Sequence, residues 1–310
     1  MGTVYFVNGF LEAGKTTFIK ELIGRESFRI PGKTLIILCE EGDTEYSDEE
    51  LQAANAVLEI IEDETDFDEK HLSVLEKKHN PERIIVEFNG MWDRKYLEFP
   101  LHWDDIMEIT VFDASTFKLY SDNLRSLLAE QVRNTELIIF NRTDEVRDKL
   151  ASYARNIKAI NNRTAFVFRG SEGDIILNPD ELLPYDINID ELNLDEVGFA
   201  MMCMDSLERY ELYEGKKVHF KAQAFKMKDK SDLEFIAGRL IMTCCEADMS
   251  FLGIICDYPN AYVLEDKEWV EVTGLIRNIY DEEMKRQIPV CRVLELEQVS
   301  TPENEFMSMI

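Results

Sequence analysis

The stretch VYFVNGFLEAGKTTFIKELI, residues 4–23, predicts a β-strand, a tight loop and an α-helix in immediate succession. Its middle, residues 9–16, matches the pattern G-x-x-x-x-G-K-[ST] at every fixed position. Backbone N–H groups and the positive end of the helix dipole attract anions at such a loop. This order of elements predicts a polyphosphate-binding loop, and the alternative is a chance match in an ordinary strand–helix turn.

The loop residues have distinct expected roles. Gly9 and Gly14 allow the backbone to approach phosphates closely. Lys15 is expected to reach the β- and γ-phosphates, and Thr16 to offer its hydroxyl to Mg²⁺, which makes both candidate catalytic residues. The expected nucleotide contacts in this segment are Gly9, Glu12, Ala13, Gly14, Lys15, Thr16 and Thr17.

Other apolar runs of the first half are nearly continuous, such as LIIL at 35–38 and LIIF at 137–140. Strands of this kind are buried on both faces, as in a parallel sheet covered by helices. Helical patterns begin at Lys15 and near Asp66, Phe117 and Glu145, between expected strands at 4–8, 34–39, 83–88, 108–112, 136–140 and 165–168. The alternation predicts an α/β fold with a doubly wound, mostly parallel sheet, and the phosphate loop after its first strand makes this the sheet expected of a P-loop NTPase.

A carboxylate follows one of these strands. RIIVE at 83–87 ends in Glu87, and a carboxylate at a strand end near the phosphate loop can hold Mg²⁺ directly or through water. Glu87 is therefore a candidate catalytic residue and metal ligand, and Gly90 could present its N–H to a γ-phosphate. The alternative is that Glu87 simply ends a strand at the solvent surface.

The segment LIIFNRTD, residues 137–144, places polar residues after another buried strand. It resembles the N-K-x-D segment that reads guanine in GTPases. The carboxylate of Asp144 could accept from guanine N1–H and N2–H₂, a donor pair that adenine lacks. Asn141 and Arg142 complete the segment, and Arg142 replaces the usual Lys, so that its guanidinium could stack on the base or ribose. The alternative is a plain turn.

Composition limits the class of protein. The 310 residues are 45% hydrophobic and 31% charged, which suits two globular domains. The net charge of −28 disfavours binding to nucleic acid or to an anionic membrane surface. Six scattered cysteines form no disulfide framework, and there is no long apolar run. We therefore expect a cytoplasmic protein without membrane insertion.

The pattern changes after the first half. We expect the nucleotide-binding domain over residues 1–176 and an acidic linker with one or two short turns over 177–209, where two prolines and many acids occur. Several short strands without intervening helices predict a smaller β-rich domain over 210–302, barrel- or sandwich-like. Residues 303–310 are expected to form a tail.

Taken together, the segments of the first half resemble the CobW-type GTPases, relatives of the HypB and UreG metallochaperones. The likeness spans about residues 1–170 and is carried by NGFLEAGKTTF at 8–18, CEEG at 39–42, VEFNG at 86–90, VFDASTF at 111–117, EQV at 130–132 and FNRTD at 140–144. The resemblance implies GTP and GDP as ligands, Mg²⁺ as cofactor, and a homodimer on GTP binding. It also implies that Glu40 lies in the first switch and helps the metal site, and that 87–90 is the Walker B motif and second switch.

One departure from that family concerns its metal motif. The family usually carries C-x-C-C between the first switch and Walker B, where this chain has AVLEIIEDETDFDEKHL at 56–72 without a cysteine. Three thiolates suit Zn²⁺ or Cu⁺, whereas carboxylates are harder ligands. Delivery of a metal is therefore not implied through this motif.

The second half resembles another group, the C-terminal domain of YcgQ-like proteins, which accompany a permease of unassigned substrate. The likeness is carried by EGKKVHFKAQAF at 214–225, GRLIMTCCEADM at 238–249 and WVEVTG at 269–274. Cys244, Cys245 and Asp248 could bind a soft metal such as Zn²⁺. The alternative is that both cysteines are small buried hydrophobes at a strand end.

These features predict a GTP-binding and GTP-hydrolysing switch, linked to metal handling through a metalloprotein partner or to a permease. Three other hypotheses remain open. The chain could be a non-catalytic module that binds partners according to its nucleotide, or an ATP-using enzyme in which NRTD is a mere turn. It could also be a thiol or metal carrier that acts through the Cys-Cys segment.

Overall fold

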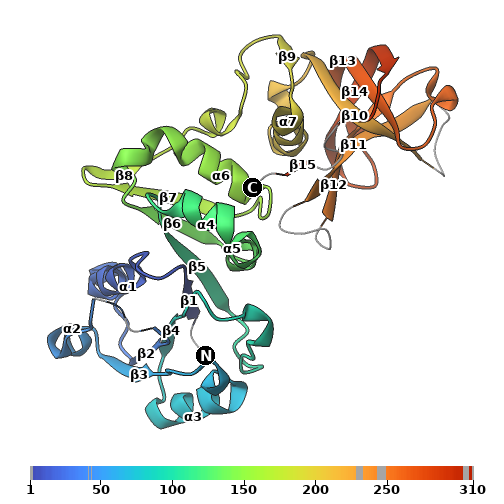
Figure 1. Ribbon diagram of the computed structural model, residues 1–310. Coiled ribbons are helices and arrows are strands. Elements are labelled where there is room, and N and C mark those ends of the chain that lie inside the picture. Colours follow the sequence, from blue (N-terminus) through green and yellow to red (C-terminus); the bar gives the residue numbers. More distant parts are fainter. Residues whose placement is uncertain are drawn as a thin grey trace. The chain divides into compact units, whose positions relative to one another are not determined.

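The computed structural model describes residues 3–40, 42, 44–227, 233–242, 249–302 and 307–308. The chain divides into two compact units, one up to Ile176 and one from Leu177 (Figure 1).

The first unit is built on a sheet of strands in the order β3-β2-β4-β1-β5-β6-β7-β8. All neighbours are parallel except β8, which pairs antiparallel with β7. The strands are β1 (Val4–Asn8), β2 (Thr34–Leu38), β3 (Ala56–Ile60), β4 (Arg83–Glu87), β5 (Ile106–Asp113), β6 (Leu137–Asn141), β7 (Ala165–Gly170) and β8 (Gly173–Ile175). The prediction of a mostly parallel sheet is confirmed, and β3 is a strand that the sequence patterns did not single out.

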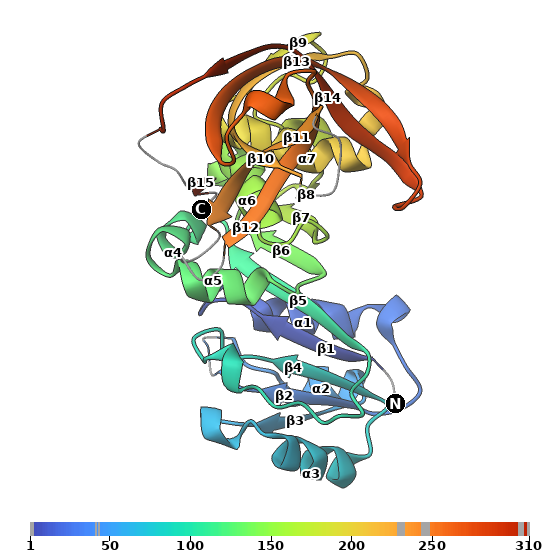
Figure 2. The ribbon, with the colours of Figure 1, turned by 90° about the vertical axis from the view of Figure 1, so that its right-hand side faces the viewer.

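Helices connect these strands and cover both faces of the sheet (Figures 1 and 2). They are α1 (Lys15–Gly24), α2 (Asp48–Ala53), α3 (Glu69–His79), α4 (Phe117–Asn123), α5 (Arg125–Val132) and α6 (Leu150–Lys158). Short 3₁₀ turns occur at Glu26–Phe28, Glu64–Asp66, Arg94–Tyr96 and Asp144–Lys149.

Two apolar cores explain why the sheet is covered on both sides. Successive side chains of β1 alternate between them, because side chains of a strand point to opposite faces in turn. Phe6 packs into a cluster with Leu72 and Leu75 of α3. Val7 packs into the other cluster with Phe18, Ile19 and Ile23 of α1. The doubly wound arrangement predicted from the hydrophobic strands is thus present.

The second unit contains a closed β-barrel. Strand β10 pairs with both β13 and β11, and the ring continues through β12 and β14 back to β13. The elements are β9 (Glu191–Asn193), β10 (Lys217–Lys226), β11 (Glu234–Met242), β12 (Met249–Asp257), β13 (Glu268–Asp281), β14 (Arg286–Gln298) and β15 (Met307–Ser308). Further 3₁₀ turns occur at Pro179–Leu182, Tyr210–Leu212 and Ala261–Val263. A small five-stranded barrel of this kind occurs in OB-folds, and it confirms the β-rich second domain.

The expected acidic linker differs from the structure in one respect. Within it lies helix α7 (Glu196–Glu208), whose run from Gly198 to Cys203 is buried. Phe199 of α7 packs against Phe220 of β10, with ring centroids 4.6 Å apart. The prolines and acids before residue 196 are typical of a linker, and they favour that interpretation of the whole segment. In addition, a helix that is apolar on nearly every side lacks the periodicity of an amphipathic helix.

Candidate phosphate and base site

The loop after β1 holds a backbone path that needs glycine. Gly9 and Gly14 have φ of 137° and 94°. A Cβ on Gly9 would lie 2.0 Å from the carbonyl oxygen of Val111, and one on Gly14 would lie 2.7 Å from Nδ2 of Asn141. Even Glu12 between them has a positive φ of 59°. The glycine spacing in the sequence therefore reflects both backbone conformation and close packing.

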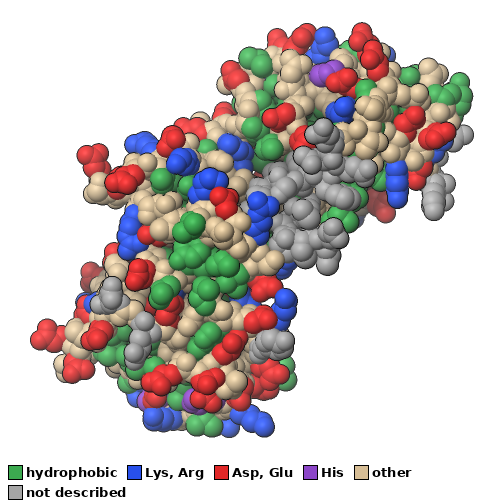
Figure 3. Space-filling view, viewed as in Figure 1, with side chains coloured by type: hydrophobic (Ala, Val, Ile, Leu, Met, Phe, Trp, Pro, Cys, Tyr) green, Lys and Arg blue, Asp and Glu red, His purple; other side chains and the backbone are tan. Residues whose placement is uncertain are grey.

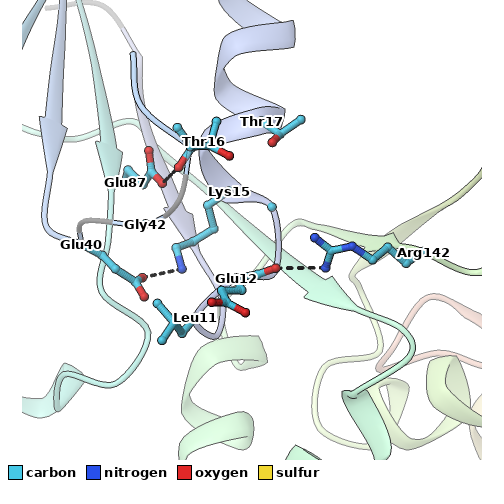
Figure 4. Close-up of a pocket in the computed structure, with 11 residues that line it drawn as sticks. Leu11, Glu12, Lys15, Thr16, Thr17, Glu40, Gly42, Glu87 and Arg142 are labelled. Atoms are coloured by element: carbon cyan, nitrogen blue, oxygen red, sulfur yellow. Dashed lines mark hydrogen bonds and ion pairs between the residues drawn. The ribbon is translucent and has the colours of Figure 1, made fainter. Parts of the chain in front are cut away.

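Lys15 begins α1 and turns back over the loop. Its Nζ donates to the carbonyl oxygens of Gly9 at 2.9 Å and Phe10 at 3.0 Å. The same Nζ lies 2.6 Å from Oε2 of Glu40, and both side chains are buried (Figure 4). The ammonium group is thus aimed into the loop, and a carboxylate neutralises it there.

Thr16, the residue after Lys15 in α1, contacts Glu87 at the end of β4. The Thr16 hydroxyl donates to Oε1 of Glu87 at 2.5 Å, and Tyr46 donates its own hydroxyl to Oε2 at 2.5 Å (Figure 4 shows the Thr16 contact). Glu87 is 2% exposed, and this burial raises the pKa of its carboxyl above the usual value, against the two hydroxyl donors. The reading of Glu87 as a solvent-facing strand end does not fit this burial.

Tyr46 was not singled out by its sequence pattern. It follows EEGDTE in a polar loop, where an aromatic residue carries no motif. Only the path of the chain after β2 brings its hydroxyl to the end of β4, 41 residues further along. Its partner residue could be predicted from the sequence, but this contact could not.

Gly90 lies directly against the phosphate loop. A Cβ at this position would be 2.0 Å from the carbonyl oxygen of Gly9. Its own carbonyl accepts from Nε2 of the buried Gln131 in α5 at 2.8 Å. The segment after β4 is therefore held beside the loop, where the sequence predicts a contact with a γ-phosphate.

Lys15, Thr16 and Glu87 line one cavity of about 160 Å³ (Figure 4). It collects the side chains that the sequence assigns to phosphates and to Mg²⁺ from three separate segments. The lining residues are Leu11, Glu12, Gly14, Lys15, Thr16, Thr17, Glu40, Gly42, Thr44, Glu87 and Arg142.

Asn141 and Arg142, at the end of β6, donate hydrogen bonds to backbone carbonyls of the phosphate loop. Asn141 Nδ2 donates to the carbonyl oxygen of Ala13 at 2.8 Å. Arg142 donates to the carbonyl oxygen of Glu12 at 3.0 Å and pairs with the carboxylate of Asp113. The guanidinium is thus engaged with the loop in this structure, whereas the sequence suggested stacking on a base or ribose.

Asp144 has a different neighbour. Both of its carboxylate oxygens accept from the backbone N–H of Ser171, at 3.0 and 3.1 Å, and the Ser171 hydroxyl donates to Oδ1 at 3.1 Å. These bonds orient the carboxylate from the loop after β7. Ser171 is a second residue that the sequence patterns did not identify, because a serine in RGSEG is also an ordinary turn residue.

A second cavity, of about 450 Å³, adjoins the phosphate cavity through Gly14, Thr17 and Arg142. Asn141 and Gly170 line it, and a Cβ on Gly170 would lie 2.9 Å from Oδ1 of Asp144. Asn141 and Arg142 of the expected base segment therefore border this cavity, whereas Asp144 is not among its lining residues and lies behind Gly170.

The residues of the phosphate cavity fit a hard divalent cation. Thr16 Oγ1 and the Glu87 carboxylate offer oxygen ligands, and among the described residues the two carboxylate oxygens accept from the hydroxyl groups of Thr16 and Tyr46. Mg²⁺ prefers such oxygen ligands. Glu40 lies in the same cavity but is paired with Lys15.

A soft-metal site has no counterpart in the described ranges. Among those residues, no group of three His, Cys, Asp or Glu side chains is placed to hold a metal ion. Cys244, Cys245 and Asp248 lie outside the residues that the structure describes. Within the same ranges, every helix is too short or too polar to cross a bilayer.

Both halves of the chain match models of known protein families. The model of the CobW/HypB/UreG nucleotide-binding domain matches residues 3–168. The chain belongs to this family. The DUF1980 C-terminal domain model matches residues 179–307, so that a CobW-family nucleotide-binding domain precedes a DUF1980-type domain.

Individual relatives are more distant. The UPF0703 protein YcgQ of Bacillus subtilis is 22% identical over 118 residues, which cover 38% of this chain and 41% of that protein. The hydrogenase maturation factor HypB of Archaeoglobus fulgidus is 14% identical, with a TM-score of 0.39 over 54% of this chain and 80% of its own. The Zn(II)-bound YjiA GTPase of E. coli is 17% identical, with a TM-score of 0.38 over 88% and 94%. At these TM-scores, the structural likeness carries no conclusion about function.

Proposed function

We propose that this chain binds GTP with Mg²⁺ and hydrolyses it as a molecular switch. The observation that carries the proposal is the contact between Thr16 and Glu87 inside the cavity that Lys15 enters. The start of α1 supplies the Lys15 ammonium and the Thr16 hydroxyl, and the end of β4 supplies the Glu87 carboxylate. All three groups line the same cavity. Membership of the CobW/HypB/UreG family supports nucleotide as the ligand.

Catalysis at such a site is mainly positioning and electrostatics. Lys15 must leave Glu40 to reach the β- and γ-phosphates, and the loop amides meet the remaining phosphate oxygens. Thr16, Glu87 and Glu40 would hold Mg²⁺, which supplies neutralisation of charge on the phosphate oxygens when it is bound. Thr16 in the first turn of α1 and Glu87 at the end of β4 are already in contact, so the rearrangement that nucleotide requires is centred on the Lys15–Glu40 pair.

We propose guanine as the base because of Asp144. Its carboxylate is oriented by Ser171, and its Oδ1 lies close to Gly170, which lines the second cavity. Guanine offers two N–H donors to such a carboxylate, whereas adenine would leave it unpaired. Asn141 would act mainly on the loop, through the carbonyl of Ala13.

The finer roles rest on the family resemblance. We propose that GTP binding favours a homodimer and that hydrolysis acts on a partner, either a metalloprotein or a permease. The second unit, whose sequence matches the DUF1980 C-terminal domain, is the part through which a permease-linked role would be exerted.

Measuring binding and turnover separately tests the enzyme against the non-catalytic module. Under single-turnover conditions with Mg²⁺, the wild type should release phosphate from GTP faster than buffer alone. Thr16→Ala should release it much more slowly, since it lacks the hydroxyl that contacts Glu87. Tight GTP binding without phosphate release in the wild type would favour the non-catalytic module instead.

A further inference from the structure

Tyr46 contacts the carboxylate that the phosphate loop also holds. Its hydroxyl donates to Oε2 of Glu87 at 2.5 Å, while the Thr16 hydroxyl donates to Oε1 at 2.5 Å. Each oxygen of the carboxylate therefore accepts one hydroxyl proton. Two donors from different segments fix both the position and the plane of the buried Glu87 side chain.

The segment that carries Tyr46 is itself anchored. Lys20 of α1 donates to the carbonyl oxygen of Glu45 at 3.0 Å and pairs with Glu50 at 2.9 Å. The Tyr46 ring packs against the apolar cluster between the sheet and α1. The position of the Tyr46 hydroxyl at Glu87 is therefore supported by the packing of its ring and by the contacts of Glu45 and Glu50 with Lys20.

Tyr46 remains a donor at neutral pH. Burial raises the pKa of its hydroxyl far above the usual value, and the negative charge of Glu87 raises it further. Thr16, in contrast, is also a candidate ligand of Mg²⁺, so its hydroxyl has two possible tasks.

We propose that Tyr46 is a positioning residue for the Mg²⁺ site, which holds Glu87 in the orientation that the metal requires. The inference rests on the proposed function and adds to it a residue outside the phosphate-loop, Walker B and base-reading segments. Mutation of a residue that hydrogen-bonds to a metal ligand commonly lowers the affinity for the metal by about 10- to 100-fold.

Tyr46→Phe tests this directly, because it keeps the ring and its packing and removes only the hydroxyl. The full chain is loaded with fluorescent GDP, and the Mg²⁺ concentration that half-maximally slows GDP release is measured. We expect that concentration to rise about tenfold in Tyr46→Phe. The GDP affinity in EDTA should stay unchanged, a separation that a merely structural role would not produce.

Tyr153→Phe is the matched control. Tyr153 lies in α6 of the same unit, buried against Phe117 and Phe140, and its variant should behave as wild type. An unchanged or smaller Mg²⁺ requirement in Tyr46→Phe overturns the proposal, as does an equal loss of GDP affinity in EDTA. Either result leaves the proposed function standing, whereas a wild type that binds no GDP overturns both.

Discussion

Glu40 and Lys15 form the most consequential pair at the scale of single residues. Their ion pair is buried, with 2.6 Å between Nζ and Oε2. A phosphate that binds Lys15 must displace the Glu40 carboxylate from the ammonium group. Glu40 therefore competes with the phosphate for Lys15 unless another cation binds the carboxylate. Mg²⁺, brought with the nucleotide, is such a cation in the function proposed above.

Glu40→Gln should therefore have opposite effects with and without metal. In EDTA, GDP should bind severalfold more tightly, because Lys15 no longer has a carboxylate to leave. In Mg²⁺ that gain should vanish. Equilibrium titration with fluorescent GDP measures both. Glu62→Gln, which removes a nearby exposed charge, serves as control, and a looser complex in EDTA for Glu40→Gln would be evidence against competition.

Asp144 tests the choice of base. Asp144→Asn should weaken GTP binding about 10- to 100-fold, because an amide cannot accept from both guanine donors as a carboxylate does. ATP affinity should hardly change. Asp148→Asn, which removes another exposed carboxylate from the same 3₁₀ turn, should leave both affinities alone. Competition between GTP and ATP measures the ratio, and an unaltered ratio in Asp144→Asn would remove this residue from base recognition.

At the scale of elements, the site depends on strand ends that the sequence could locate. The apolar strands, the glycine spacing and the acid at the end of β4 can be predicted from the sequence, because each follows from local chemistry. Tyr46 and Ser171 cannot be, since their roles arise from where two loops run in space. Helix α7 could not be predicted for a different reason: its buried run shows no polar face.

The same helix gives a prediction about stability. Asp195 caps α7, with its carboxylate accepting from the Gly198 N–H at 2.7 Å. Asp195→Ala should lower the free energy of local opening at the start of α7 by about 1 kcal/mol. Hydrogen exchange of these amides in the full chain measures it. Asp195→Asn should retain most of the protection, because asparagine also caps well, and equal losses in both variants would refute the cap.

At the scale of the whole molecule, charge dominates. The net charge is −28, and acidic side chains are spread over the face seen in Figure 3. GTP is also an anion, so the protein's long-range field repels its own proposed ligand until the local amides and Lys15 take over. Repulsion of this kind acts across solvent and is screened by salt, whereas the contacts inside the cavity are screened much less.

Association of GTP should consequently speed up with added salt. Between low and physiological ionic strength, we expect a severalfold rise in the association rate, measured by stopped-flow fluorescence with a labelled nucleotide. The uncharged nucleoside carrying the same label is the control and should show no such rise. A rate that falls with salt would mean that a local positive field steers the nucleotide.

The most direct test of the central claim is calorimetry of the purified chain with GTP, GDP and ATP in Mg²⁺, with Lys15→Ala beside the wild type. The account predicts that GTP and GDP bind the wild type, that ATP binds far more weakly, and that Lys15→Ala loses nearly all affinity for the triphosphate. A wild type that takes up neither guanine nucleotide, or a Lys15→Ala variant that binds GTP as well as the wild type, would contradict it.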